Sequence, residues 1–100
     1  VDQMSFSDAD YRTKRKQTWR KRFLAEMDEV IPWRRLEKRI VPFYRKTGGR
    51  PPYPLRVMLR IHLMQHWYGL SDPAMEDALY EITSMRQFAG LSLSTGRIPD

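Results

Sequence analysis

Residues 54–90 decide the fold, and they read PLRVMLRIHLMQHWYGLSDPAMEDALYEITSMRQFAG. Over residues 54–68 apolar side chains cover nearly the whole circumference of a helix, and a helix of this kind is buried. Pro54 suits the first turn of such a helix. Gly69 suits the left-handed position that ends it, and Leu70 can fold back against its last turn. The segment therefore predicts a central core helix.

Two shorter helices are predicted after the core helix. Ser71-Asp72-Pro73 is typical of a capping residue followed by a first-turn proline, and it begins a helix to about Ile82. Thr83 or Ser84 is then expected to cap a short fifth helix, which Gly90 ends.

Two further helices are predicted upstream. The first begins at about Tyr11, and its apolar residues recur at helical spacing in one stripe formed by Trp19, Phe23, Met27 and Val30. Trp19 lies among the cations and could stack, but its spacing with Phe23 predicts that it packs in the core. The stripe is missing from the first two turns, which should therefore project into solvent. The second covers residues 33–41, with four cations facing outward at Arg34, Arg35, Lys38 and Arg39. Pro42 makes its continuation improbable, and residues 45–54, rich in Gly and Pro, exclude regular structure.

These patterns predict an all-α fold, because neither strand alternation nor an internal repeat is present. We expect a small bundle of about five helices that carries a basic amino-terminal arm. Residues 1–10 are expected to be a disordered amino terminus, residues 11–90 the helical domain, and residues 91–100 a polar tail.

Positive charge is concentrated in the first half of the chain. The net charge is +6, and residues 1–50 carry 14 Lys and Arg against 7 Asp and Glu. Seven of these cations lie within eleven residues: Arg12, Lys14, Arg15, Lys16, Arg20, Lys21 and Arg22. Such a cluster can neutralise phosphates and release their counterions, so it predicts nucleic-acid binding. The alternatives are a solvated face or contact with an acidic protein or membrane surface.

The remaining chemistry of the sequence points away from an enzyme. The chain has no cysteine, which excludes disulfides, thiolate metal sites and cysteine nucleophiles. No set of nucleophile, base and orienting residue is recognisable. No apolar run is long enough to cross a bilayer, and the amino terminus does not have the pattern of a signal peptide. A cytoplasmic location is expected.

Two groups of residues resemble metal sites without matching them. His62 and His66 are four residues apart on the core helix, but Leu63 and Met64 replace the Glu of a metalloprotease motif. We interpret the histidines as packed or hydrogen-bonded residues at the edge of the core. The acidic residues of 72–81 are explained by electrostatics at a helix start. We therefore predict neither a metal nor a cofactor.

The order of short motifs along the chain is more specific than the helical periodicity. The residues that carry it are Pro52-Tyr53-Pro54-Leu55, Met58-Leu59-Arg60-Ile61-His62 and Met64-Gln65-His66-Trp67-Tyr68, followed by Leu70-Ser71-Asp72, residues 75–82, Ser84-Met85-Arg86, Phe88-Ala89 and Leu91-Ser92-Leu93. Upstream, Lys14-Arg15, Phe23-Leu24, Ile31-Pro32-Trp33 and Pro42-Phe43-Tyr44 follow in the same order. This arrangement closely resembles the amino-terminal region of bacterial IS5-family insertion-sequence transposases, from about Phe6 to Asp100.

The resemblance implies a helix-turn-helix-like domain that precedes a separate catalytic domain of the ribonuclease-H-like type. In that family an Asp-Asp-Glu triad binds two divalent metals for strand cleavage and transfer. The acidic residues of 72–81 match the helical amino-terminal segment and not the triad. We therefore expect a chain without the catalytic domain, either an isolated domain or a truncated copy, and no enzymatic activity.

Two functions follow as hypotheses. The first is a DNA-binding module, associated with the nucleoid, that positions transposase on terminal inverted repeats. The cations of residues 12–22 would contact phosphates, and a second patch in the loop would comprise Arg45, Lys46 and Arg50. The alternative is an oligomerisation module, or a fragment that regulates intact transposase through mixed oligomers. Its adaptable surface would be Met58, Met64, Met75 and Met85, unless these residues pack in the core.

Overall fold

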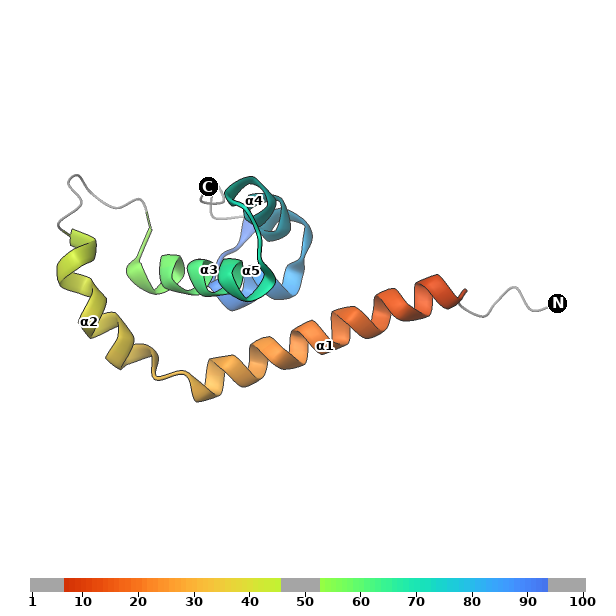
Figure 1. Cartoon of the computed structure of the whole chain (residues 1–100), viewed down its shortest axis with the longest axis horizontal. Coiled ribbons are helices and arrows are strands. Elements are labelled where there is room, and N and C mark those ends of the chain that lie inside the picture. Colours follow the sequence, from red (N-terminus) through yellow and green to blue (C-terminus); the bar gives the residue numbers. More distant parts are fainter. Residues whose placement is uncertain (1–6, 46–52, 94–100) are drawn as a thin grey trace.

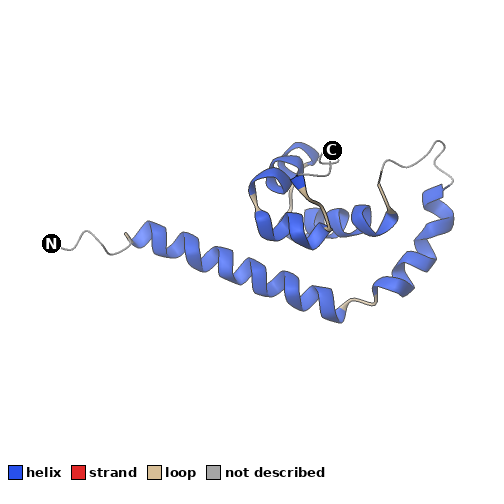
Figure 2. Ribbon diagram, turned by 180° about the vertical axis from the view of Figure 1, so that it is seen from behind, coloured by secondary structure: helices blue, strands red, loops and turns tan. Residues whose placement is uncertain are grey.

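Five helices and no strand make up the part of the chain that the computed structural model describes, residues 7–45 and 53–93 (Figures 1 and 2). They are α1 (Asp8–Val30), α2 (Trp33–Arg45), α3 (Leu55–Tyr68), α4 (Asp72–Glu81) and α5 (Thr83–Ala89). The all-α prediction is confirmed. Helices α3, α4 and α5 form a bundle, α1 packs against α5, and α2 packs against α3.

The hydrophobic core lies where α3, α4 and α5 meet. Helix α1 contributes Leu24 to it. The other buried side chains all come from the three bundle helices: Val57, Ile61, Met64, Met75, Ala78, Leu79, Met85, Phe88 and Ala89. The prediction of a central core helix is therefore confirmed for α3. The burial expected around its whole circumference is wrong, because only Val57, Ile61 and Met64 are buried, whereas Leu59 and Leu63 are half-buried.

Local capping residues set the limits of the bundle helices. Gly69 and Gly90 adopt the left-handed conformation after α3 and α5, with φ angles of 62° and 84°. The Ser71 hydroxyl accepts a hydrogen bond from the backbone N–H of Ala74 at 3.3 Å and so caps α4. These three predictions are confirmed.

The start of α5 differs from the prediction. Neither Thr83 nor Ser84 is its capping residue, because Ile82 holds that position and makes no side-chain capping bond. Arg86 of α5 joins this helix to α4. Its Nη1 donates to the carbonyl oxygens of Leu79 at 2.9 Å and Tyr80 at 2.7 Å. This guanidinium satisfies carbonyls at the carboxyl end of α4, which favours a cation.

Helix α1 begins earlier than predicted. The Ser7 hydroxyl accepts from the backbone N–H of Asp10 at 3.2 Å, and the carboxylates of Asp8 and Asp10 lie in the first turn. Both features stabilise a helix start. The expectation of a disordered segment through Asp10 is therefore wrong for residues 8–10, and residues 1–6 lie outside the described residues.

Helix α2 continues through Pro42, contrary to the prediction that it ends at Val41. Proline at this position removes the N–H that would bond to the carbonyl of Lys38. Pro42 and Lys38 are both exposed, so water can hydrate that carbonyl. The following turn is held by Tyr44, whose hydroxyl donates to the carbonyl of Tyr53 at 2.8 Å. The tertiary contact thus offsets the unfavourable proline.

One guanidinium joins four helices. Arg60 on α3 lies over the ring of Trp33 on α2, with its Cζ 4.2 Å from the ring centroid. Its Nη1 donates to the carbonyl of Phe88 on α5 at 3.0 Å, and its Nη2 lies 2.7 Å from Oδ1 of Asp28 on α1. The indole Nε1 of Trp33 also donates to the carbonyl of Asp28 at 3.1 Å. We call these four residues the Arg60 junction, and it fixes the carboxyl end of α1 to the bundle.

Candidate nucleic-acid interface

The amino-terminal half of α1 extends past the bundle (Figure 1). Four of the seven predicted cations, Arg12, Lys14, Arg15 and Lys16, lie on this half, and the other three follow in the next turn, beside the bundle. All seven are exposed except Arg20, which is half-buried. No carboxylate in the described ranges pairs with four of them, Arg12, Lys16, Lys21 and Arg22. The prediction that the first turns of this helix project into solvent is confirmed.

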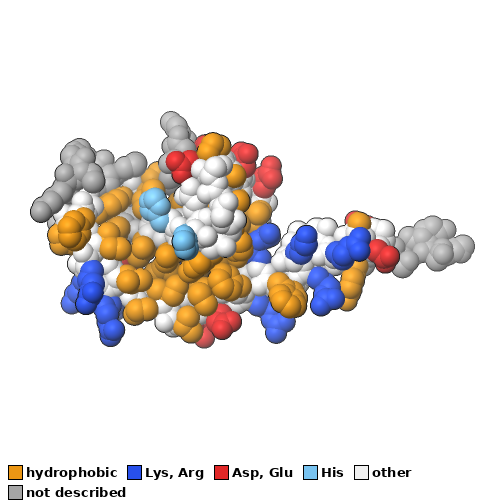
Figure 3. Space-filling view, in the orientation of Figure 1, with side chains coloured by type: hydrophobic (Ala, Val, Ile, Leu, Met, Phe, Trp, Pro, Cys, Tyr) orange, Lys and Arg blue, Asp and Glu red, His pale blue; other side chains and the backbone are white. Residues whose placement is uncertain are grey.

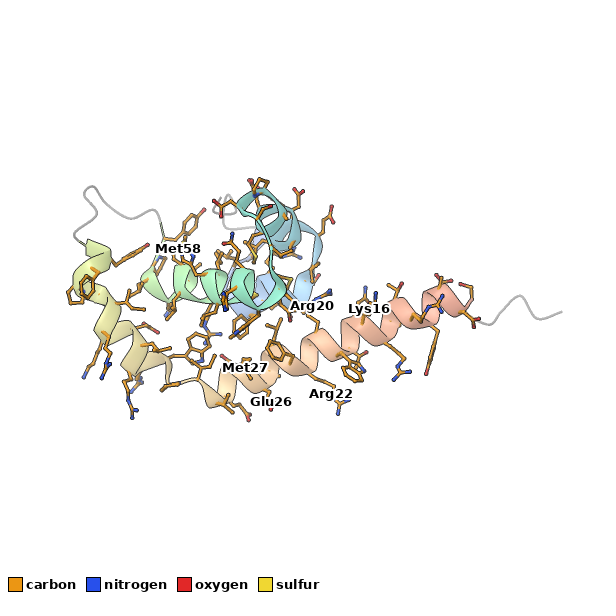
Figure 4. The ribbon with its side chains drawn as sticks, in the orientation of Figure 1. Lys16, Arg20, Arg22, Glu26, Met27 and Met58 are labelled. Carbon is orange, nitrogen blue, oxygen red and sulfur yellow. The ribbon has the colours of Figure 1, made fainter. Side chains whose placement is uncertain are left out.

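The seven cations do not share one face. Figure 4 shows Lys16 and Arg20 on the side of α1 that faces the bundle, whereas Arg22 and Glu26 point to the opposite side. Arg20 lies near Tyr68 of α3, with its Cζ 5.9 Å from the ring centroid. The helix therefore presents cations both toward the bundle and away from it.

A groove lies between α1 and the carboxyl end of α3, with a volume of about 630 Å³. Its cations all come from α1: Arg12, Arg15, Lys16 and Arg20. Its aromatic residues come from both helices: Trp19, Phe23, Trp67 and Tyr68. We call this feature the α1–α3 groove. Figure 3 shows apolar atoms surrounded by Lys and Arg on the extended part of α1.

The floor of the α1–α3 groove is an aromatic cluster. The ring of Phe23 meets Trp67 edge to face, with centroids 5.2 Å apart, and meets Tyr68 at 6.2 Å. The Tyr68 hydroxyl is buried without a hydrogen-bond partner, and burial raises the pKa of Tyr68 while the positive charge of Arg20 opposes the rise. This part of the groove is packed and apolar.

The predicted apolar stripe of α1 is only partly correct. Phe23 and Met27 pack against the core, but Trp19 is 65% exposed and Val30 is 62% exposed. Helix α1 is longer than each bundle helix and extends past the bundle (Figure 1). The residue expected in the core therefore lies at the wall of the α1–α3 groove.

A second row of cations follows the outer face of α2. Arg34, Arg35, Lys38 and Arg39 are all exposed, as their predicted outward orientation requires. Sequence reasoning assigned them no function, although their spacing already places them on one helix face. The patch predicted instead in the loop begins at Arg45, the last residue of α2, whereas Lys46 and Arg50 lie outside the described residues.

The position of the two histidines of α3 contradicts the sequence-based interpretation. His62 and His66 are exposed, so describing them as packed core-edge residues is wrong. No group of three or more potential metal ligands occurs among residues 7–45 and 53–93. Asp72 accepts a hydrogen bond from Gln65 Nε2 at 2.7 Å, in keeping with a role at the start of α4.

Among residues 7–45 and 53–93, no helix is long and apolar enough to cross a membrane.

Comparison with known proteins connects this geometry to a family. The model of a family described as a transposase domain, DUF772, matches residues 11–100. This range includes nearly all of α1 and the whole of α2 to α5. No solved structure matches the chain. Because the match covers most of the sequence, the chain belongs to the DUF772 family of transposase domains.

Proposed function

We propose that the chain is a DNA-binding module of an IS5-type transposase and that it positions the enzyme on terminal inverted repeats. The observation that carries the proposal is the row of exposed cations on α1, among which Arg12, Lys16, Lys21 and Arg22 pair with no carboxylate of the described residues. Membership of a transposase-domain family supports a role in transposition.

The geometry of α1 suits contact with a polyanion. Residues 12–22 span about 15 Å along the helix at a rise of 1.5 Å per residue. Duplex DNA carries about one negative charge per 1.7 Å of its axis, so several phosphates lie within this length. The outer face of α2 supplies a second row, and a duplex that reaches both rows would be held in a defined orientation. Phosphate contacts give affinity and register, whereas specificity needs contacts to bases.

We further propose that strand transfer takes place outside this chain. The resemblance to IS5-family transposases puts the Asp-Asp-Glu triad in a separate domain. The carboxylates of α4 match the amino-terminal helical segment of that family, and Asp72 already bonds to Gln65. The module would bind and position, while the chemistry belongs to the catalytic domain.

Assembly of transposase subunits is the alternative function. The methionines proposed for such a surface are poorly suited to it, because Met64, Met75 and Met85 are buried in the core of a single copy and Met58 is half-buried. The exposed ring of Phe43, at 70%, is the observation that favours assembly. Sedimentation without DNA tests this alternative, because a dimer that Phe43→Ala abolishes would support it.

Binding of a labelled duplex, followed by fluorescence anisotropy, tests the proposed function. We expect a variant with Lys16→Gln, Lys21→Gln and Arg22→Gln to lose affinity for a mixed-sequence duplex. The control is Arg56→Gln, which removes an exposed cation from α3. A duplex with the inverted repeats that flank the gene should bind more tightly than the mixed sequence. If the triple variant binds both duplexes as well as the control does, the proposal is wrong.

A further inference from the structure

We propose that the α1–α3 groove binds an unpaired nucleotide of single-stranded DNA, with the base stacked on Trp19 and the phosphates held by Arg12, Lys16 and Arg20. The inference rests on the proposed function, because it assumes that the chain contacts nucleic acid. It adds a site that duplex binding by the cations of α1 does not require.

The first step of the argument is the exposed indole. Trp19 is 65% exposed, and no ring pair of the described residues includes it. Its neighbour Phe23 is held by Trp67 and Tyr68, so the floor of the groove is already packed. Trp19 therefore has a large aromatic surface beside the packed floor, and a planar partner would bury it.

The second step is the arrangement of charge around this indole. Arg12, Lys16 and Arg20 recur every four residues, which sets successive cations about 6 Å apart along the helix. They line the same groove as Trp19, and Figure 4 shows Lys16 and Arg20 on the bundle-facing side of α1. A row of cations beside an exposed ring combines a track for a backbone with a platform for a base.

The third step separates single strands from duplex. In a duplex each base is covered by its neighbours, so only phosphates and groove edges are available to α1. An unpaired base offers its face, and stacking on an aromatic side chain is tolerant of sequence. The groove volume of about 630 Å³ lies within the range of about 300–1,000 Å³ that is common for small-molecule sites. An aromatic groove with four cations thus fits a nucleotide better than it fits a paired helix.

The test compares single-stranded and duplex probes with Trp19 variants. The probes are an oligothymidylate of about 15 nucleotides and a mixed-sequence duplex of equal length. We expect Trp19→Ala to weaken oligothymidylate binding roughly 5- to 150-fold and duplex binding by less than about twofold. Trp19→Phe should retain most of the affinity because it keeps a ring. Phe43→Ala, which removes an exposed ring outside the groove, should change neither affinity.

Fluorescence supplies a second readout. Oligothymidylate should quench the tryptophan emission of the wild-type chain. Trp19→Phe should remove most of that quenching, since Trp33 lies outside the groove and Trp67 is half-buried in its floor against Phe23. Circular dichroism of each variant establishes that the helices are intact.

Three results would overturn the inference. Unchanged oligothymidylate binding by Trp19→Ala overturns it and leaves duplex binding by the cations standing. A dimer without DNA that depends on Trp19 also overturns it, because a second copy, with the acidic α4 as its complementary face, would then cover the groove. Loss of the Lys16, Lys21 and Arg22 charges without any loss of duplex or single-strand binding overturns the inference together with the proposed function.

Discussion

The substitution Arg60→Ala tests whether the Arg60 junction holds α1 and α2 on the bundle. The side chain of Arg60 is 21% exposed. Its guanidinium makes three kinds of contact: a hydrogen bond to the Phe88 carbonyl, an ion pair with Asp28, and close approaches to the rings of Trp33 and Phe88. Alanine removes all of them and leaves the carbonyl of Phe88 without this donor.

The expected loss follows from these contacts. A hydrogen bond from a charged donor contributes about 1.5–3 kcal/mol. A partly desolvated cation over aromatic rings contributes about 0.5–2 kcal/mol. The ion pair adds about 0–1 kcal/mol, at the low end because Asp28 is 53% exposed. Since contacts that share one side chain are not additive, we expect Arg60→Ala to lower the free energy of unfolding by about 2–4 kcal/mol.

Urea unfolding, followed by the helical circular dichroism signal, measures this loss. The transition midpoint should fall while the slope with urea stays the same, because the folded state buries nearly the same surface. Arg60→Lys should lose less than alanine, since it retains the charge but not the planar donors. The matched control is Arg56→Ala, an exposed cation on the same helix. Equal midpoints for Arg60→Ala and Arg56→Ala would refute the account of the junction.

Substitutions at four other residues test the core, a helix cap and the buried hydroxyl of Tyr68. Leu79→Ala should cost about 2–5 kcal/mol because this side chain is fully buried, whereas Trp19→Ala should leave the urea midpoint almost unchanged. Gly69→Ala should cost about 1–2 kcal/mol at a φ of 62°, although no atom lies within 4 Å of an added Cβ. Gly69→Asn should lose less stability in the same urea unfolding, because asparagine tolerates the left-handed conformation better than alanine does. Tyr68→Phe should not destabilise the chain at neutral pH, since the hydroxyl is buried without a partner. Burial raises the pKa of Tyr68 above 10.0. The folded chain therefore keeps its stability below that pH and loses stability above it, where the buried hydroxyl is driven to ionise. The phenylalanine variant cannot ionise and should lose less stability in alkaline melts.

The sequence predicts best what depends on near neighbours. Gly69, Ser71 and Gly90 act through the backbone within a few residues, and all three occupy the expected capping positions. The start of α1 had the same kind of signal, since Ser7 precedes two acidic residues, but the polar character of the segment obscured it. Arg12, Lys14, Arg15 and Lys16 were also correctly placed on the projecting turns of α1, because the apolar pattern stops upstream of Trp19.

What the sequence could not predict depends on residues far apart along the chain. The Arg60 junction needs Asp28, Trp33 and Phe88 together, and periodicity within α3 gives no sign of it. Pro42 was expected to end α2, yet the Tyr44 contact holds the next turn. The exposure of Trp19 depends on how far α1 extends beyond α3, so helical spacing alone placed it wrongly in the core.

The salt dependence of duplex binding tests most directly whether the cations of α1 contact phosphates. The logarithm of the association constant should fall linearly with the logarithm of the salt concentration, by about 0.9 for each phosphate contact. The account predicts a slope that is shallower by roughly 2 to 3 for the variant with Lys16→Gln, Lys21→Gln and Arg22→Gln than for the wild-type chain. Parallel lines for the two proteins would contradict it.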